Sequence, residues 1–357
     1  MSRVLVMVGT RKGAFLLESD ESRTRWSVTG PHCQHWPLRH VNYDPATGAI
    51  YAAGGSPWYG PAVWKSTDLG RSWTHSSQGI TYGDEGPKLN TLWNVTPAHG
   101  ALYVGADPAG LFRSGDGGET FAHVTGLRDH PTCPQWAPGN GGMCLHTIVP
   151  HPADPRQMWV AASAIGTFYT ADGGESWTAR NRGLKADYLP PETEHEVGFC
   201  VHKMVMAPGM PNRLYQQNHQ GVYRSDDGGS SWEWINDGLP TTFGFPIVAH
   251  PRDPNTVYVI PLSGDSKGRY MIDGQAAVWR TRDAGRSWER LSRGLPQEGA
   301  YVSVHREAMA ADPLPSAGIY FGTTTGQVFV SPDEGESWLL AADFLPQIAS
   351  IEVAVID

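Results

Sequence analysis

The octapeptide Thr170–Trp177, with the sequence TADGGESW, decides the fold, because five close variants of it recur along the chain. The variants are Ser66–Trp73 (STDLGRSW), Ser114–Phe121 (SGDGGETF), Ser225–Trp232 (SDDGGSSW), Thr281–Trp288 (TRDAGRSW) and Ser331–Trp338 (SPDEGESW). Their aspartates are 48, 56, 55, 56 and 50 residues apart, and a worn copy, Ser19 to Trp26, precedes the first. Seven units of about 51 residues therefore account for the 357 residues of the chain.

Each octapeptide has the composition of a tight turn between two strands. Its aspartate can accept hydrogen bonds from backbone N–H groups of the same turn, and its glycine supplies a positive φ. Short strand-like runs precede it, such as Leu102–Gly105 and Gly110–Arg113, and a segment ending in proline, such as Ile148 to Pro152, begins the unit. Four short strands per unit at this period are typical of a β-propeller blade. We expect the repeated aspartates to be structural: Asp68, Asp116, Asp172, Asp227, Asp283 and Asp333.

The two ends of the sequence complement each other. The chain opens with a second-strand pattern at Val4–Val8 and closes with a first-strand pattern at Ser350–Ile356. Pairing these segments would complete a seventh blade and leave no open sheet edge. The sequence thus predicts an all-β fold: residues 1–357 form one seven-bladed β-propeller domain with Asp-box repeats, closed by its terminal strands.

Composition excludes several classes of function. Gly 42 and Pro 28 indicate many tight turns, and 40% hydrophobic residues with 14 Trp exclude a disordered chain. The net charge of −9 disfavours nucleic acid and anionic membranes as partners. The apolar run Val4–Val8 is too short for a signal-peptide core or a membrane span, so we expect a cytoplasmic protein.

The four cysteines lack CxxC spacing, which favours reduced thiols and leaves a Cys133–Cys144 bridge open. The sequence has no nucleotide-binding motif, and it leaves the oligomeric state undetermined.

The repeated pattern S/T-x-D-x-G-x-T/S-W/F is the Asp-box, or BNR repeat, and the whole sequence resembles the sialidase-like propellers. Met7–Phe15, Gly139–His146, Glu196–His202 and Phe243–Pro246 resemble a bacterial group labelled BNR-repeat glycosyl hydrolase or exo-sialidase-like. The boxes also occur in xyloglucanases, in sortilin-type receptors and in a photosystem assembly factor that is not an enzyme. The resemblance therefore implies the fold and leaves the reaction open.

A true sialidase is disfavoured. The sialidase resemblance implies three arginines that hold a carboxylate, a tyrosine activated by a glutamate, and an aspartate. Pro37–His40 does not match the motif of the first arginine, and only Arg39, Arg128 and Arg306 are expected to reach the axial mouth. Tyr301 with Glu298 or Glu307 is the one substitute for the tyrosine–glutamate pair.

A glycoside hydrolase or lyase at the axial mouth is the first of three functional hypotheses. It needs two carboxylates at the mouth. Three connections between strands are unusually long, namely 123–145, 179–201 and 261–277. These and shorter connections contain the candidate carboxylates Glu194, Glu196, Asp273, Glu298 and Glu307. The expected catalytic residues are Glu196, Tyr301, Glu307, Arg39 and Arg306. A small-molecule or glycan ligand would contact Trp36, His195, Trp58 and Trp136, because aromatic faces stack on sugar rings.

The second hypothesis is a metal-dependent enzyme. When the first strands are aligned by their terminal proline, His146 and His202 occupy the same position, Glu307 falls on it, and His40 lies one residue away. Imidazoles and a carboxylate around one axis suit a divalent metal ion in the axial channel, with His40, His146 and His202 as ligands. The third hypothesis is a non-catalytic propeller that serves as a platform for a protein or glycan.

Overall fold

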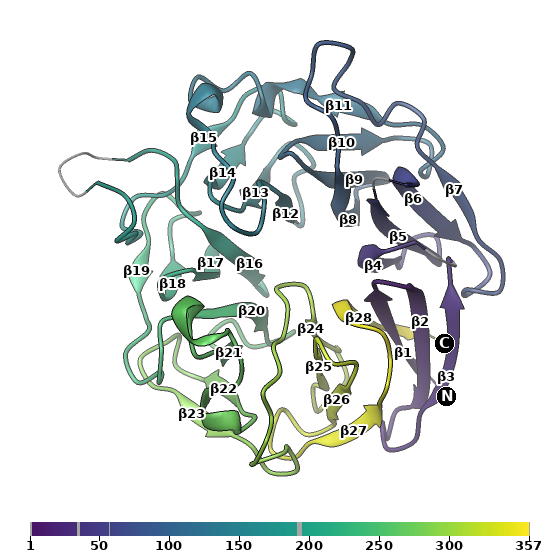
Figure 1. The fold of residues 1–357 in the computed structure, drawn as a ribbon, viewed down its shortest axis with the longest axis vertical. Helices are drawn as coiled ribbons and strands as arrows, with labels where there is room; N and C mark the ends of the chain where they lie inside the picture. The colour runs from purple at the N-terminus through teal and green to yellow at the C-terminus, as the bar shows by residue number, and fades with distance from the viewer. Residues whose placement is uncertain (1, 34–35, 57, 191–194, 357) are drawn as a thin grey trace.

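A computed structural model describes residues 2–33, 36–56, 58–190 and 195–356, which form seven four-stranded antiparallel sheets arranged in a ring (Figure 1). The predicted all-β, seven-bladed β-propeller is confirmed. Each sheet is one blade, and its first strand faces the centre of the ring while its fourth strand lies at the periphery (Figure 1).

The blades are numbered here along the chain, and their strands have the following bounds. Blade 1 contains β28 (Ile348–Ile356), β1 (Arg3–Thr10), β2 (Gly13–Asp20) and β3 (Ser27–His32). Blade 2 contains β4 (Leu38–Asp44), β5 (Ala49–Ser56), β6 (Gly60–Ser66) and β7 (Thr74–Ser76). Blade 3 contains β8 (Thr91–Ala98), β9 (Ala101–Asp107), β10 (Leu111–Ser114) and β11 (Ala122–Val124). Blade 4 contains β12 (Leu145–Pro150), β13 (Met158–Ala162), β14 (Gly166–Thr170) and β15 (Thr178–Ala179).

The last three blades follow the same order. Blade 5 contains β16 (Val201–Ala207), β17 (Met210–Asn218), β18 (Val222–Ser225) and β19 (Glu233–Trp234). Blade 6 contains β20 (Gly244–Ala249), β21 (Val257–Pro261), β22 (Val278–Thr281) and β23 (Glu289–Leu291). Blade 7 contains β24 (Met309–Ala311), β25 (Ile319–Gly322), β26 (Val328–Ser331) and β27 (Leu339–Ala342). Within the described residues, the helices are short 3-10 turns at Thr125–Leu127, Cys133–Gln135, Asp265–Lys267 and Ile272–Gly274.

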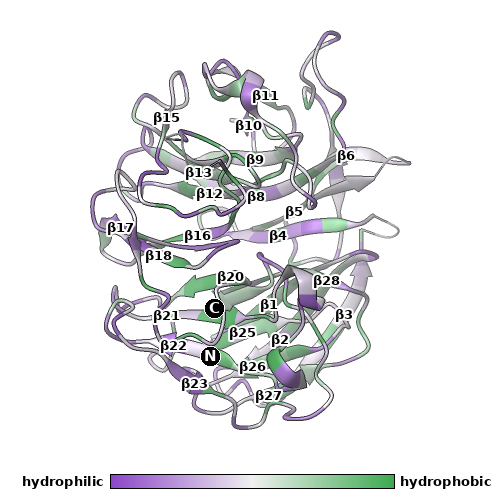
Figure 2. Ribbon diagram, turned by 60° about the vertical axis from the view of Figure 1, so that its left-hand side comes forward, coloured by the Kyte–Doolittle hydropathy of each residue, from purple (hydrophilic) through white to green (hydrophobic). Residues whose placement is uncertain are grey.

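The core lies within and between the blades. Figure 2 shows the hydrophobic residues gathered in the strands and the hydrophilic residues in the connections. The last aromatic residue of several boxes is buried in this core: Phe121, Trp177, Trp232 and Trp338. The repeated sequence therefore gives each sheet a similar hydrophobic face to pack against its neighbours.

The box aspartates close the turns between third and fourth strands. In blade 4, Asp172 accepts hydrogen bonds from the backbone N–H of Ser176 (3.0 Å) and from the hydroxyl of Thr170 (2.7 Å). Gly174 has φ 100°, and a Cβ there would lie 2.6 Å from the side chain of Val124. The boxes therefore have the local bonding that scaffold residues need.

The pairing of β28 with β1 closes the ring. The register runs from Arg3 opposite Ile356 to Thr10 opposite Ile348, with one irregularity next to Gly9. The predicted closure by the N- and C-terminal strands is therefore present.

The cysteines are free thiols, so Cys133 and Cys144 form no bridge. Among the residues that the structure describes, none of the helices has the length and apolar character needed to cross a bilayer.

A first prediction concerns ring closure. A chain ending at Ala349 should melt at a much lower temperature than the full chain, because β1 would lose its partner and blade 1 would become an open edge. Differential scanning calorimetry measures the change. A truncated chain as stable as the full one would show that the ring does not need β28.

A second prediction concerns the boxes. Asp227→Ala should lower the free energy of unfolding by about 1–3 kcal/mol, because Ser231 and Ser225 lose a charged acceptor. The matched control is Asp84→Ala, at an exposed aspartate outside the boxes. Urea denaturation compares the two variants, and equal stabilities would contradict a structural role for the box.

The same bonds make stability depend on pH. The hydrogen bond from the Ser72 side chain, followed by the bond from its backbone N–H, lowers the pKa of Asp68 from 3.8 to about 2. The folded-state pKa lies below the unfolded one, so this contribution is present above pH 4 and is lost as the pH falls towards 2.

Candidate functional site at the ring axis

Six first strands carry a β-bulge near their beginning; in β28 the bulged residue is Ala349, next to the closing pair with β1, and five more bulges lie in blades 2 to 6. The register skips one residue between Leu38 and His40, Leu92 and Asn94, Leu145 and Thr147, and Val201 and Lys203, and two residues between Gly244 and Ile247. The bulged residues of blades 2 to 6 are Arg39, Trp93, His146, His202 and Phe245 (with Pro246), and we call these five the bulge ring. Bulges re-aim side chains and are common beside functional sites.

The bulge ring converges at the axis. The guanidinium of Arg39 lies 4.6 Å from the ring centroid of Trp93, and the rings of His202 and Phe245 are 4.7 Å apart. The guanidinium of Arg306, from blade 7, lies 5.3 Å from Trp93 and 5.9 Å from Phe245. The side chain of Arg306 therefore contacts residues of blades 3 and 6. Arg39 and Arg306 both contact Trp93, so the two arginines meet at the axis as expected.

Arg306 is a buried cation whose hydrogen-bond partners among the described residues are neutral. Its residue is 9% exposed, and it donates to the hydroxyl of Ser163 (2.7 Å) and to the thiol of Cys144 (3.4 Å). In the described part of the chain, no carboxylate oxygen lies within 4.0 Å of Arg306 or Arg39. Burial, followed by the charge of Arg11, lowers the pKa of Arg39. The arrangement therefore favours an anion at the axis.

One carboxyl group near these arginines has a perturbed pKa. Asp107, at the end of β9, is half-buried, and burial raises its pKa against the opposing effects of Asn90, Met143 and Arg39. A carboxyl group with a raised pKa is suited to donate a proton.

A second group of charges lies around Glu307. Its carboxylate, 1% exposed, forms an ion pair with Lys203, and its Oε2 lies 4.0 Å from Nε2 of His40. His146 Nδ1 lies 3.9 Å from Oε1, which has no hydrogen-bond partner among the described residues. Nε2 of His40 also lies 3.2 Å from Oε1 of Glu352. The expected convergence of His40, His146 and Glu307 is therefore observed.

The ring nitrogens of His40 and His146 are engaged within the protein. Nδ1 of His40 contacts the backbone of Val95, while Nε2 of His146 donates to the carbonyl of Val201 (2.9 Å) and Nδ1 faces the hydroxyl of Thr147 (2.9 Å). Burial, followed by the charge of Arg306, lowers the pKa of His146 well below 6.5. This histidine is therefore a neutral member of a hydrogen-bond network.

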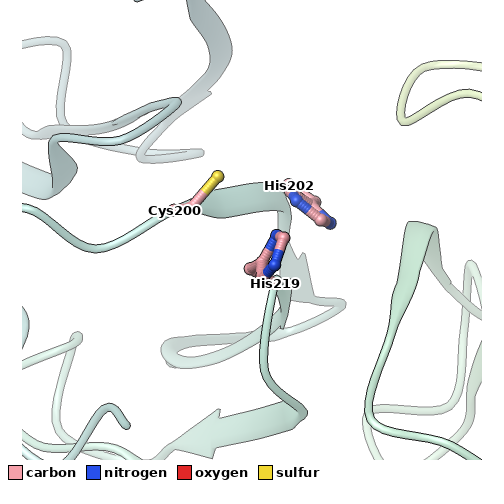
Figure 3. Close-up of side chains that lie close together, drawn as sticks. All are labelled: Cys200, His202 and His219. Carbon is pink, nitrogen blue, oxygen red and sulfur yellow. The ribbon is translucent and has the colours of Figure 1, made fainter. Parts of the chain in front are cut away.

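His202 lies in a different group from His40 and His146. Its Nδ1 donates to the carbonyl of Gly244 (2.5 Å), and its metal-binding atoms gather with those of Cys200 and His219 (Figure 3). The three residues expected to share one metal ion are thus divided between two clusters.

His195 and Glu196 line a cavity of about 850 Å³ along the connection between β15 and β16. Its other walls include Leu184, Asp187, Leu189 and Phe199. The carboxylate of Glu196 is 3.8 Å from His130, and His195 donates to the carbonyl of Pro190 (2.8 Å). Glu194 lies outside the described residues. Glu196 therefore lies at this cavity and Glu307 at the ring axis, so the two expected catalytic carboxylates do not share one site.

The aromatic residues expected to bind a ligand lie away from the bulge ring. Trp36 packs against Tyr59, Trp64 and His75, which belong to or flank the outer strands of blade 2, and Trp136 packs against Phe168 on β14. Trp58 is 92% exposed.

Tyr301 and the remaining acids are also peripheral to the bulge ring. Tyr301 is 64% exposed and packs edge-on against Tyr270, and Glu298 lines a separate cavity of about 570 Å³. Asp273 lies in a short 3-10 turn at φ 54°. Arg128 contacts Tyr82 and donates to the carbonyl of Ala109, so it does not join Arg39 and Arg306.

Sequence reasoning missed Trp93, Asp107 and Lys203. Four of the bulge-ring residues stand six positions before a proline, namely Pro45, Pro152, Pro208 and Pro251, but the sixth position after Trp93 is His99, so this spacing does not mark Trp93. The same count from Pro313 gives Glu307. By this count Arg39, rather than His40, is the equivalent of His146. No comparable pattern marks Asp107 or Lys203.

No protein-family model matches the sequence. A xyloglucanase of Hypocrea jecorina (strain QM6a) is 23% identical over 217 residues, which cover 56% of this chain and 22% of that protein. The chain thus matches about a fifth of the length of this relative.

Two solved structures share the fold. The periplasmic gluconolactonase of Pseudomonas aeruginosa has a TM-score of 0.62 at 13% identity and covers 99% of this chain and 100% of its own. The structure of YCF48 bound to D1 peptide has a TM-score of 0.57 at 13% identity, with 86% and 82% covered. At these identities the likeness establishes the fold alone. The chain is therefore a seven-bladed β-propeller with sequence similarity to a glycoside hydrolase.

The buried pair Lys203–Glu307 gives a third prediction. Glu307→Gln and Lys203→Met should each destabilise by about 3–5 kcal/mol, because each leaves one buried charge unpaired. The double variant should lose less than the sum of the two. The control is Glu18→Gln, which removes the exposed pair with Arg3 and should change stability by less than about 1 kcal/mol. Additive losses in urea denaturation would refute the coupling.

Proposed function

We propose that the protein is a carbohydrate-active propeller of glycoside hydrolase type that binds a sugar carrying an anionic group at the bulge ring. The observation that carries the proposal is Arg306, a buried guanidinium held by a thiol, a hydroxyl and two aromatic faces instead of a carboxylate. A buried cation is stabilised by a paired anion, and guanidinium groups bind carboxylates and phosphates in a bidentate manner.

The apolar part of such a ligand would contact Trp93. The guanidinium groups of Arg39 and Arg306 lie 4.6 and 5.3 Å from the ring centroid of this indole, and its Nε1 has no hydrogen-bond partner among the described residues. An aromatic face beside cationic donors is the combination that a sugar acid requires, since the ring packs on the indole while the acidic group meets the arginines.

For hydrolysis, we assign Asp107 as proton donor and Glu307 as the second carboxylate. The raised pKa of Asp107 suits a general acid, while Lys203 compensates the charge of Glu307 and leaves its Oε1 without a partner. The similarity to the xyloglucanase of Hypocrea jecorina supports a glycosidase over other hydrolases. The sialidase-like resemblance of the Asp-boxes agrees with an acidic sugar, and besides Arg39 and Arg306 the guanidinium of Arg269 lies 6.0 Å from the ring of Phe245.

The fourth prediction tests binding. In calorimetric titrations, oligosaccharides with uronic or sialic acid residues should bind more tightly than neutral xyloglucan oligosaccharides. Arg306→Gln should weaken binding of the acidic ligands by about 10- to 100-fold, because a charged hydrogen bond is lost. Arg128→Gln is the matched control, since Arg128 lies near Tyr82 instead of the axis, and it should bind normally.

Turnover is tested separately by release of reducing ends. Asp107→Asn should abolish release while leaving binding within about twofold, because the amide cannot donate the catalytic proton. Binding without turnover in the unaltered protein would refute the hydrolase assignment and support a platform. Equal affinity for acidic and neutral ligands, or no binding of either, would refute the proposed sugar site itself.

A further inference from the structure

Three side chains with metal-binding atoms gather at one end of the hairpin formed by β16 and β17 (Figure 3). Cys200 directly precedes β16, His202 is the bulged residue of that strand, and His219 directly follows β17. The backbone N–H of His219 donates to the carbonyl of Cys200 (2.9 Å). The metal-binding atoms of the three residues lie within 4.8 Å of one another. Sheet pairing and a bulge therefore bring the cluster together.

His202 is in the form that binds a metal. Its Nδ1 donates to the carbonyl of Gly244, so the lone pair of the ring is on Nε2. A backbone carbonyl on the far nitrogen is the usual support of a metal-binding histidine, because it fixes the ring and its tautomer.

The other two side chains are positioned by aromatic neighbours. The ring of His219 packs edge-on against Tyr188 (5.7 Å) and Phe243 (5.1 Å). The backbone N–H of Cys200 donates to the hydroxyl of Tyr188 (2.8 Å), and its thiol is free and half-buried. Tyr188 therefore contacts both residues and holds them on the same side of the hairpin.

We propose that Cys200, His202 and His219 form a binding site for a thiophilic transition metal ion, with Zn²⁺ as the expected ion. One thiolate and two imidazoles match the ligands that Zn²⁺ prefers, whereas Mg²⁺ and Ca²⁺ require oxygen ligands. Ligand atoms around tetrahedral zinc are about 3.5 Å apart, so the half-buried side chains of Cys200 and His219 would rotate inward on binding. The thiol would release its proton as the metal–sulfur bond forms.

Three protein ligands leave one position of a tetrahedral ion open to water or to a ligand. Because His202 also belongs to the bulge ring, a bound ion would add positive charge beside Arg306. The two proposed sites share His202, whereas Arg306 and Trp93 do not belong to the metal-binding cluster.

The fifth prediction uses Co²⁺ as the probe. Chelator-treated, reduced protein titrated with CoCl₂ should show a thiolate-to-cobalt charge-transfer band and visible bands of tetrahedral intensity, saturating at one equivalent. Added Zn²⁺ should displace the cobalt. Cys200→Ser should abolish the charge-transfer band, and His219→Ala should weaken binding by about 100-fold or more, because a direct ligand is worth at least as much as its supporting groups.

The matched control is Cys133→Ser, which removes another half-buried free thiol outside the cluster and should keep the band. Thermal melts of each variant verify that it is folded. The site is refuted if the unaltered protein shows no charge-transfer band, if Cys200→Ser retains it, or if Cys133→Ser loses it. Loss of sugar binding by the Arg306 variant with an intact cobalt spectrum would separate the two proposals.

Discussion

The pairing of β28 with β1 is the interaction on which the ring axis depends. It joins the last strand of the chain to the first sheet, in a register that places Val353 opposite Val6. The same closing strand positions the axial carboxylate, because the backbone N–H of Ile351 donates to the carbonyl of Glu307 (2.8 Å). Glu352, one residue further, reaches His40 on blade 2. Ring closure therefore supplies the hydrogen bonds that hold blades 1, 2 and 7 around one centre.

The bulges explain how a repeated backbone supports a varied centre. In a regular strand successive side chains point to opposite faces, whereas a bulge lets two successive residues serve the same region. In β16 the bulged residue His202 is directed to Cys200 and His219, while the next residue, Lys203, pairs with Glu307 in the neighbouring group of charges. The boxes repeat nearly the same residues at the turns, and the bulges carry different residues in each blade. The residues that stabilise the fold, in the boxes, are therefore different from the bulged residues that line the axis.

The sequence predicts the fold well because the boxes report a local structure that repeats with nearly constant spacing. It places Glu307 at the axis because Glu307 and His146 stand at the same distance from a proline, and it places His40 one residue away from that position. The same spacing also fits Arg39, but a bulge leaves no mark in composition that would show that this residue is the equivalent of His146. Lys203 lies 104 residues from its partner Glu307, and no pattern links them. Trp36 and Trp136 occupy connections whose composition does not reveal that they fold over outer strands.

The charge at the axis comes from arginine rather than from histidine. Burial, followed by the charge of Arg306, lowers the pKa of His146 and of His202 well below 6.5 and that of His305 to about 4. These imidazoles are therefore neutral at pH 7, while the guanidinium groups stay charged. In a protein with a net charge of −9, the cations Arg39, Arg306 and Lys203 thus lie at the axis together with the carboxylates of Glu307 and Asp107. Because the arginines at the axis are buried, salt screens their interaction with a neighbouring charge less than it would at the surface. Selection of an anionic ligand would then occur at the axis and not during the approach to the protein surface.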